Sequence, residues 1–335
     1  MDANVPMSAP GRPFDGLEPG VILDAVEHFG VRCDGRLLAL NSFENRVYQV
    51  GSEDGLAVVA KFYRPARWSD ASILEEHAFS RELAEREIPV VAPLEDAAGS
   101  TLAGHAGFRY AVYPSVGGYW PELQDRADRS LLGRLVGRLH AVGSIKSFRH
   151  RPAIDAESYG ARSADFLLEG NFLPPGIDGA YRRVTDELLD RVRERYARVP
   201  QMQLLRLHGD LHRGNILWSG QGCAIVDLDD CRSGPAIQDL WMLLAGSDHD
   251  IRVQLNDLLG GYRTFFDFDH REILLVEALR ALRMMHHAAW LAKRWADPAF
   301  PIAFPWFNTP AYWEGHLTDL REQAAKLAEP VAGMV

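Results

Sequence analysis

A short apolar hairpin with oxygen-bearing side chains at its ends constrains this chain more than any other feature. Residues 208–215 read His-Gly-Asp-Leu-His-Arg-Gly-Asn, and apolar stretches follow at 216–218 and 223–226, on either side of a Ser-Gly-Gln-Gly turn. Two apolar runs separated by turn residues predict a β-hairpin. Because Asn215 comes directly before the hairpin and Asp227 directly after it, the hairpin brings their side-chain oxygens side by side.

These residue types are the ones that phosphoryl transfer requires. The reaction needs a carboxylate that accepts the proton of the substrate hydroxyl, and oxygen ligands that hold Mg²⁺ on the phosphates of ATP. Asp210 can supply the carboxylate, and Asn215 and Asp227 can supply the ligands. Hard oxygen donors without Cys or His favour Mg²⁺ or Mn²⁺ over zinc. With Asp229 and Asp230, three acidic residues end an apolar strand, an arrangement that calls for a positive charge among them.

Two histidines flank the candidate catalytic aspartate. The spacing from His208 through Asp210 to Asn215 matches the kinase catalytic loop H-x-D-x-x-x-x-N, with Gly209 where many protein kinases carry Arg. His208 and His212 are four residues apart, but they flank a turn and not a helix, which argues against a zinc site. We therefore expect His208 to orient the catalytic loop.

Composition limits the classes of partner and compartment. A chain of 335 residues suits two domains, and 47% apolar with 24% charged residues is ordinary for a globular protein. The net charge of −10 argues against a nucleic-acid partner. Three cysteines without metal-like spacing indicate free thiols in a reducing compartment. Residues 1–19 lack the apolar run of a signal peptide, and no run is long enough for a membrane span. We expect a flexible leader, a cytoplasmic protein and no membrane partner.

The order of predicted elements divides the chain into two lobes. Residues 20–114 form a small β-rich, nucleotide-binding N-lobe, with strands over 37–40, 46–50, 56–62 and 108–113 and a helix over 69–86. A Pro/Gly stretch at 114–118 is the candidate hinge. Residues 115–335 form a larger helical C-lobe with the catalytic loop, metal site and substrate cleft; we expect helices over 131–139, 178–198, 236–245, 250–264, 270–296 and 309–327. The fold class is α+β, in a bilobal layout.

The candidate nucleotide-binding residues lie at the start of this layout. Lys61 ends an apolar strand that half-buries its stem, so its ammonium needs an anion, which ATP phosphates and a helix carboxylate would supply. Glu76 is the candidate carboxylate because it shares an inward helix face with Phe79, and Glu75 is its rival. The loop at 41–45 lacks the pattern G-x-G-x-x-G and, taken alone, reads as an ordinary hairpin turn. Its Ser42 offers a hydroxyl and an N–H to a phosphate.

Several longer blocks of sequence resemble the aminoglycoside-phosphotransferase-like kinases, and among these the bacterial stress-response kinases. The resemblance runs from roughly residue 15 to 330, in the blocks 40–48, 61–65, 207–210, 226–230, 234–244 and 294–301. It implies a protein-kinase-like fold and an ATP- and Mg²⁺-dependent kinase that phosphorylates Ser and Thr, in the response to oxidative and envelope stress. It assigns the proton acceptor to Asp210, Mg²⁺ ligation to Asn215 and Asp227, and an ATP contact to Ser42. The implied partners are ATP and a protein substrate, with a monomeric enzyme.

The sequence also departs from ordinary protein kinases. His212 stands where Ser/Thr kinases carry a lysine that faces the transferred phosphate, which implies a part in neutralising its charge. Asp227 is followed by Leu-Asp-Asp instead of Phe-Gly, and no Ala-Pro-Glu segment follows, so switching through a phosphorylated activation loop is not expected. Asp239 either braces the catalytic loop by accepting backbone N–H groups or serves as a first-turn helix residue.

Two other functions are compatible with these motifs. A small-molecule kinase for an aminoglycoside, an amino alcohol or a sugar would keep the fold and change the acceptor, and an acidic protein suits a cationic acceptor. A nucleotide-binding scaffold without activity is the second alternative. The intact set of Lys61, Asp210, Asn215 and Asp227 argues against a scaffold.

Overall fold

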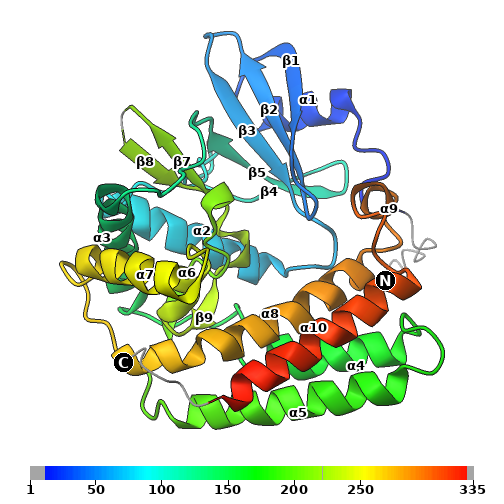
Figure 1. Ribbon diagram of the computed structural model, residues 1–335. Helices are drawn as coiled ribbons and strands as arrows, with labels where there is room; N and C mark the ends of the chain where they lie inside the picture. Colours follow the sequence, from blue (N-terminus) through cyan, green and yellow to red (C-terminus); the bar gives the residue numbers. More distant parts are fainter. Residues whose placement is uncertain (1–11, 221, 330–335) are drawn as a thin grey trace. The chain divides into compact units, whose positions relative to one another are not determined.

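The computed structural model describes residues 12–220 and 222–329 (Figure 1). The chain divides into two compact units. The first comprises the residues up to 74 together with 93–115 and 294–305, and the second comprises 75–92, 116–293 and 306 onward. Residues 1–11 of the expected flexible leader lie outside the described part. Helix α1 occupies Pro19–His28, where no helix is predicted from the sequence.

The first unit is built on a five-stranded antiparallel sheet. Its strand order is β1-β2-β3-β5-β4, with bounds Cys33–Leu40, Arg46–Ser52, Ala57–Phe62, Ala103–His105 (β4) and Phe108–Pro114 (β5). Helix α1 packs its apolar face, which includes Ile22 and Val26, against sheet residues such as Val50 and Phe62. The hydroxyl of Tyr110 donates to the carbonyl of Ala25 at 2.6 Å and so pins the helix to the sheet. The short helix α9, Ala299–Ala303, also belongs to this unit.

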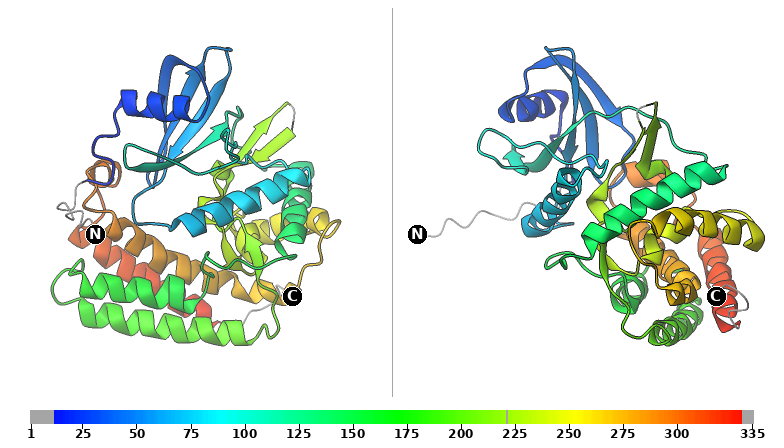
Figure 2. Two further views of the ribbon diagram at one scale, coloured as in Figure 1. Left: turned by 180° about the vertical axis from the view of Figure 1, so that it is seen from behind. Right: turned by 90° about the vertical axis from the view of Figure 1, so that its left-hand side faces the viewer.

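The second unit is largely helical. Helix α2, Asp70–Glu85, starts in the first unit and continues into the second. The other helices of the second unit are α3 (Arg126–Gly143), α4 (Arg162–Glu169), α5 (Asp178–Ala197), α6 (Ile237–Trp241), α7 (Asp248–Tyr262), α8 (Val276–Lys293) and α10 (Pro310–Ala328). Helices α4, α5, α8 and α10 lie side by side (Figures 1 and 2). A five-stranded sheet followed by a largely helical region confirms the predicted α+β class.

Two small two-stranded sheets of the second unit flank and contain the segment from His208 to Asp230. Strand β6 (Leu205–Leu207) pairs with β9 (Arg232–Gly234), and β7 (Ile216–Ser219) pairs with β8 (Gly222–Ile225). Both pairings are antiparallel, and the β7–β8 hairpin lies between β6 and β9 in the sequence. The predicted hairpin is therefore confirmed, and β6 and β9 hold the segments on either side of it.

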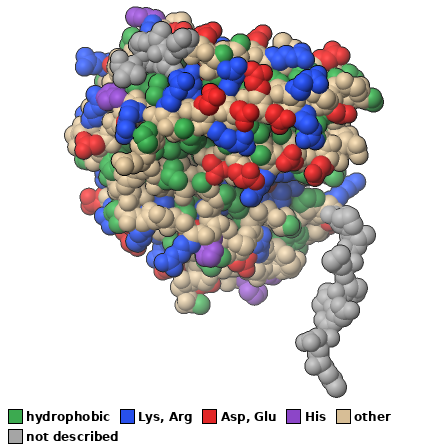
Figure 3. Space-filling model, turned by 90° about the horizontal axis from the view of Figure 1, so that it is seen from below, with side chains coloured by type: hydrophobic (Ala, Val, Ile, Leu, Met, Phe, Trp, Pro, Cys, Tyr) green, Lys and Arg blue, Asp and Glu red, His purple; other side chains and the backbone are tan. Residues whose placement is uncertain are grey.

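Charged side chains of both signs are intermixed over the face shown in Figure 3. The negative net charge of −10 is therefore not gathered into a single acidic field on this face. Among the helices within residues 12–220 and 222–329, none combines the length and the apolarity that crossing a membrane requires.

Glycines allow helices α3 and α7 to approach each other closely. A Cβ at Gly133 would overlap the carbonyl oxygen of Leu258, and a Cβ at Gly137 would overlap that of Tyr262. On the opposite helix, a Cβ at Gly261 would overlap the carbonyl oxygen of Ser130. Because these neighbours are backbone atoms, they cannot rotate away. Glycine at these positions therefore permits the close approach of the two helices.

Two adjacent glycines of α7 give a matched test of this packing. The exchange Gly261→Ala should lower the free energy of unfolding by about 1–3 kcal/mol, the usual range for overpacking. Its neighbour Gly260 has open space where a Cβ would lie, so Gly260→Ala should leave stability unchanged or raise it by up to about 1 kcal/mol. Thermal or urea unfolding of both variants measures the difference. Equal effects of the two exchanges would contradict close packing at Gly261.

Candidate active site

The catalytic loop follows β6 and turns sharply at Gly209. This glycine has a φ of +85°, and a Cβ here would overlap the carbonyl oxygen of Asp230. A side chain is therefore excluded on both counts, which explains why the arginine found here in many protein kinases is absent. The side-chain amide of Gln238 donates to the carbonyl of Gly209 at 3.0 Å and fixes the turn from the other side. Asp210 leaves this turn with its side chain partly exposed.

Asp239 of α6 braces this loop from below. Its carboxylate accepts the backbone N–H of His208 at 2.8 Å and that of Gly209 at 2.9 Å. The carboxylate is fully buried, and Nε2 of His140 lies 3.1 Å from it. Burial by itself would raise the pKa of Asp239, but the hydrogen bonds and charge of His140, with help from the loop, hold it below its ordinary value. Of the two roles considered for Asp239, the structure shows that it braces the catalytic loop by accepting backbone N–H groups.

His208 links the catalytic loop to the end of the hairpin. Its Nδ1 accepts the backbone N–H of Asp210 at 3.3 Å, so the ring proton is on Nε2, which donates to the carbonyl of Val226 at 2.9 Å. Val226 immediately precedes Asp227. Both ring nitrogens are occupied by backbone groups, which fits the predicted orienting role and not metal ligation.

The hairpin places the two metal-ligand candidates next to each other. The N–H of Val226 donates to the carbonyl of Asn215 at 3.0 Å, so the two ends of the hairpin meet. The Asn215 amide nitrogen donates to the carbonyl of Asp210 at 3.0 Å, which leaves its oxygen as the acceptor that can face a ligand. Asp227 has a left-handed backbone conformation, φ 61° and ψ 63°, of the kind that concentrates at functional sites.

The donor set suits a hard cation. One amide oxygen and one carboxylate are ligand types that Mg²⁺ accepts together with water and substrate phosphates. Among the described residues, no group of three or more His, Cys, Asp or Glu side chains could hold a metal ion by itself. The candidate site is therefore a mixed pair of oxygen donors, Asn215 and Asp227.

Arginines supply positive charge to the acidic segment after the hairpin. Arg232 approaches the carboxylate of Asp230 at 3.5 Å. Arg151 is buried, and its guanidinium donates to the carbonyls of Cys231, at 2.9 Å, and of Asp229. Burial would lower the pKa of Arg151, but Cys231 and the acidic side chains around it raise the pKa above its ordinary value. Arginines therefore supply the positive charge that the sequence calls for around Asp229 and Asp230, and the metal at Asn215 and Asp227 stays a prediction.

The two rival glutamates of α2 have different surroundings. The carboxylate of Glu75 accepts the backbone N–H groups of residues 149–151 at 2.6, 2.7 and 3.0 Å. Glu76 is 2% exposed, and its charge is one of those that raise the pKa of Arg151. Glu75 is therefore committed to a backbone turn. The choice of Glu76 as the partner of Lys61 stays a prediction.

In the first unit, arginines hold the loop that carries Ser42. Arg64 donates from its side chain to the carbonyls of Glu44, at 2.9 Å, and Phe43, at 3.2 Å. Its backbone N–H donates to the side chain of Asn45 at 3.1 Å. A loop tied down at three successive residues is stiff, which makes a glycine-rich sequence unnecessary at this point.

A segment from far down the chain completes this arrangement. Arg294 contacts the carboxylate of Glu44 at 2.6 Å, and Asp297 contacts Arg64 at 2.7 Å. The ring of Phe304 packs against that of Phe43 with their centroids 4.9 Å apart. Residues 294–301 are one of the blocks on which the sequence resemblance rests. Lys61, on β3, is 6% exposed and lies over the ring of Tyr63.

The sequence missed the cation beside Asp210. Nη1 of Arg283, in the middle of α8, lies 2.7 Å from one carboxylate oxygen of Asp210. The other carboxylate oxygen faces Nε2 of His212 at 3.6 Å. Burial lowers the pKa of His212, an effect that Asp210 opposes and Arg283 supports. Arg283 is 73 residues from Asp210 in the sequence and belongs to no recognised motif, so only the fold reveals the contact.

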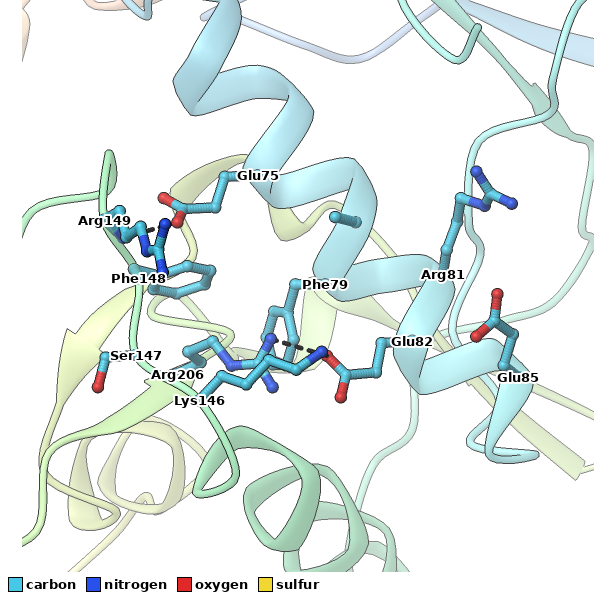
Figure 4. Close-up of a pocket in the computed structure, with 11 residues that line it drawn as sticks. Glu75, Phe79, Arg81, Glu82, Glu85, Lys146, Ser147, Phe148, Arg149 and Arg206 are labelled. Atoms are coloured by element: carbon cyan, nitrogen blue, oxygen red, sulfur yellow. Dashed lines mark hydrogen bonds and ion pairs between the residues drawn. The ribbon is translucent and has the colours of Figure 1, made fainter. Parts of the chain in front are cut away.

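A cavity of about 790 Å³ lies between α2 and residues 146–149 (Figure 4). Arg206 of β6 and Lys146 both reach Glu82 in its wall, at 2.9 and 3.5 Å. Burial would raise the pKa of Glu82, but Arg206 holds it below its ordinary value. Because β6 leads into the catalytic loop, this ion pair ties α2 to the loop. The carboxylates of Glu75 and Glu82 are both paired within the wall.

Comparisons with known proteins agree with this geometry. Residues 36–276 match the family described as "Phosphotransferase enzyme family". Over 317 residues the chain is 45% identical to Stress response kinase A of Escherichia coli (strain K12) and to Serine/threonine protein kinase RdoA of Salmonella typhimurium (strain LT2), covering 95% of each chain. The solved amicoumacin kinase hAmiN, in complex with AMP-PNP, Ca²⁺ and Ami, matches with a TM-score of 0.67 at 20% identity, over 89% of this chain and 90% of that one. The predicted fold is confirmed.

The pH dependence of stability tests the contact between Glu272 and the start of α6, the helix that carries Asp239. Its carboxylate is buried and accepts the N–H of Ile237 at the start of α6, and burial raises its pKa to about 7. The folded protein therefore favours the protonated acid, and stability falls as the pH rises from the ordinary value near 4.5 through 7. Between about pH 5 and about pH 8, wild type should lose up to about 3 kcal/mol relative to Glu272→Gln.

Thermal unfolding of both proteins at the two pH values measures this effect. The control is Glu187→Gln, which removes a half-exposed carboxylate on α5 that pairs with Arg191. The control should show the same pH dependence as wild type. If Glu272→Gln also follows wild type at both pH values, Glu272 does not carry the raised pKa.

Proposed function

Because the chain belongs to the phosphotransferase enzyme family, we propose that it is an ATP-dependent protein kinase that phosphorylates Ser and Thr hydroxyls in a bacterial stress response. The observation that carries this proposal is the braced Asp210, next to the paired ends of the hairpin that bear Asn215 and Asp227. The relatives at 45% identity over 95% of the chain bear the names of a stress response kinase and a serine/threonine protein kinase. Similarity of that extent supports a protein as the acceptor.

In the proposed reaction, Asp210 accepts the proton of the acceptor hydroxyl. The hydroxyl oxygen forms a bond to the γ-phosphorus of ATP, the bond from that phosphorus to the β,γ-bridging oxygen breaks, and ADP leaves. Asp239 accepts the N–H groups of His208 and Gly209, and His208 accepts that of Asp210 itself, so the backbone leading into Asp210 is fixed before the substrate arrives. Positioning of this kind supplies much of the catalysis in phosphoryl transfer.

Asn215 and Asp227 would hold Mg²⁺. The support is the meeting of their chain ends and the hard oxygen chemistry of the pair. When bound, the ion neutralises charge on the ATP phosphates. Asp227 has a left-handed backbone conformation, and the carboxylate of the nearby Asp230 pairs with Arg232.

The nucleotide phosphates are the proposed partners of Ser42 and Lys61. Support for Ser42 comes from the arginine-held loop, which presents a hydroxyl and N–H groups in a fixed arrangement. Support for Lys61 comes from its burial, because an ammonium that is 6% exposed requires nearby negative charge. Glu76 is the proposed carboxylate partner of Lys61, since Glu75 is occupied by backbone donors.

The segment after Asp227 favours an enzyme that is active without loop phosphorylation. A 3₁₀ turn at Leu228–Asp230 and strand β9 follow Asp227 directly. The N–H of Ser233 donates to the carbonyl of Pro152 and its carbonyl accepts from the N–H of Ile154, so β9 is fixed in place. This part of the chain therefore leaves no room for a long activation loop between Asp227 and α6.

Replacement of the proposed base tests the reaction. Asp210→Asn should lower turnover on the order of 10²-fold or more, because the amide cannot accept the hydroxyl proton. Transfer from γ-labelled ATP is measured with a generic protein substrate, with cell lysate and with a panel of aminoglycosides, amino alcohols and sugars. Asp190→Asn, at an exposed position on α5, is the matched control and should retain wild-type activity.

The same assay separates the competing functions. Label on small molecules alone would replace the protein-kinase proposal with a small-molecule kinase. ATP binding without transfer to any acceptor would indicate a scaffold. Near wild-type turnover of Asp210→Asn would show that this aspartate is not the base.

The metal proposal has its own test in Asp227→Asn. Asparagine tolerates the left-handed backbone and preserves size, so the fold should be retained while one negative charge is lost. Calorimetric titration with ATP, with and without Mg²⁺, should show that the gain in affinity from Mg²⁺ shrinks or disappears. Affinity for metal-free ATP should stay at the wild-type level. An undiminished gain from Mg²⁺ would remove Asp227 from the metal site.

A further inference from the structure

Arg283 is the permanent cation of the catalytic centre in the second unit. Its Nη1 lies 2.7 Å from Asp210 and 3.8 Å from the sulfur of Met242, and its other hydrogen-bonding atoms, Nη2 and Nε, contact no acceptor among the described residues. The side chain is 39% exposed. One edge of the guanidinium is thus held by the base, and the other edge is open.

The open edge has the geometry of an anion receptor. A guanidinium presents its donors in a rigid plane and pairs with two oxygens of a phosphate or carboxylate at once. Arg283 is held only at Nη1, so the remaining donors can bind such oxygens without breaking the contact to Asp210. Because arginine keeps its charge at every pH at which proteins fold, its electrostatic contribution does not depend on protonation.

His212 lies on the other side of the Asp210 carboxylate, with its Nε2 3.6 Å from Asp210. The carboxylate is therefore flanked by an imidazole on one side and by the Arg283 guanidinium on the other. Of these two groups, the guanidinium is the one whose charge does not depend on protonation.

We propose that Arg283 is a catalytic residue that binds non-bridging oxygens of the phosphoryl group while it passes from ATP to the acceptor hydroxyl. This rests on the proposed function and extends it. Arg283 forms and breaks no covalent bond; the hydroxyl proton goes to the Asp210 oxygen that faces His212, and the bonding electrons of the cleaved bond leave with ADP. Nη1 of Arg283 contacts the opposite carboxylate oxygen of Asp210, so the base and the guanidinium are held 2.7 Å apart.

The role assigned to Arg283 differs from a structural one in what it predicts. A cation that acts on charge developing during transfer changes turnover and leaves nucleotide binding nearly unchanged. Arg283→Ala should lower kcat by about 10²–10³-fold, the range for loss of one preorganised donor, while the dissociation constant for ATP changes by less than about threefold. Arg283→Lys should recover only part of the rate, because an ammonium lacks the planar fork.

The experiment compares Arg283→Ala with a matched variant one turn earlier on α8. Arg280 has a nearly equal side-chain exposure, 38%, and pairs with Glu277 instead of the base, so Arg280→Ala should retain wild-type turnover. Guanidinium ion, added at concentrations well below those that unfold the protein, should restore part of the turnover of Arg283→Ala. It should not accelerate wild type or Arg280→Ala. Thermal unfolding of each variant is measured alongside.

Asp210→Asn separates this inference from the proposed function. If Asp210→Asn abolishes transfer but Arg283→Ala keeps turnover within about threefold of wild type, the kinase proposal stands and the role of Arg283 is wrong. If Arg283→Ala loses activity together with thermal stability, and guanidinium restores nothing, Arg283 is structural. Selective loss of kcat that guanidinium partly restores supports the catalytic role.

Discussion

The buried carboxylate of Asp239 is the contact on which the catalytic centre depends. Two backbone N–H groups of the catalytic loop donate to it, and Nε2 of His140 lies 3.1 Å from it. A lone carboxylate at this depth would be strongly unfavourable, whereas one with three donors is stable. Gly209, where neither the backbone conformation nor the surrounding space admits a side chain, forms the turn from which Asp210 leaves.

Arginines distribute positive charge through a protein whose net charge is −10. Arg151 and Arg232 contact the acidic turn after the hairpin. Arg206 links α2 to β6, and Arg64 holds the loop at residues 41–45 in the first unit. Arg232 pairs with the nearby Asp230, and in the other cases a planar guanidinium binds backbone carbonyls or carboxylates of segments distant in sequence. Arginine suits such positions because its donors are fixed in direction and its charge does not depend on pH. Lysine, with a flexible stem and one point charge, would hold the same segments less firmly.

Sequence reasoning succeeded for features that depend on local residue types and their spacing. The hairpin and the meeting of its ends at Asn215 and Val226 are formed by residues close together in the chain, and the structure contains both. Helix α1 was missed although Ile22, Ala25, Val26 and Phe29 form an apolar stripe with helical spacing, a signal that was available. Arg283 and the segment at 294–301 carried no local signal, because their roles arise from contacts across large sequence separations.

The loop that carries Ser42 shows how tertiary contacts can replace a local sequence pattern. Glycine-rich loops reach a phosphate by being small and flexible, and such loops lose much conformational freedom on binding. Here Phe43, Glu44 and Asn45 are all fixed by Arg64, while Arg294 and Asp297 arrive from near the end of the chain to hold Glu44 and Arg64. The ordering is thus completed during folding, before any ligand binds. It follows that exchanges at Arg294 or Asp297, remote in sequence from any recognised nucleotide motif, should act on the first unit's loop and not on the chemistry at Asp210.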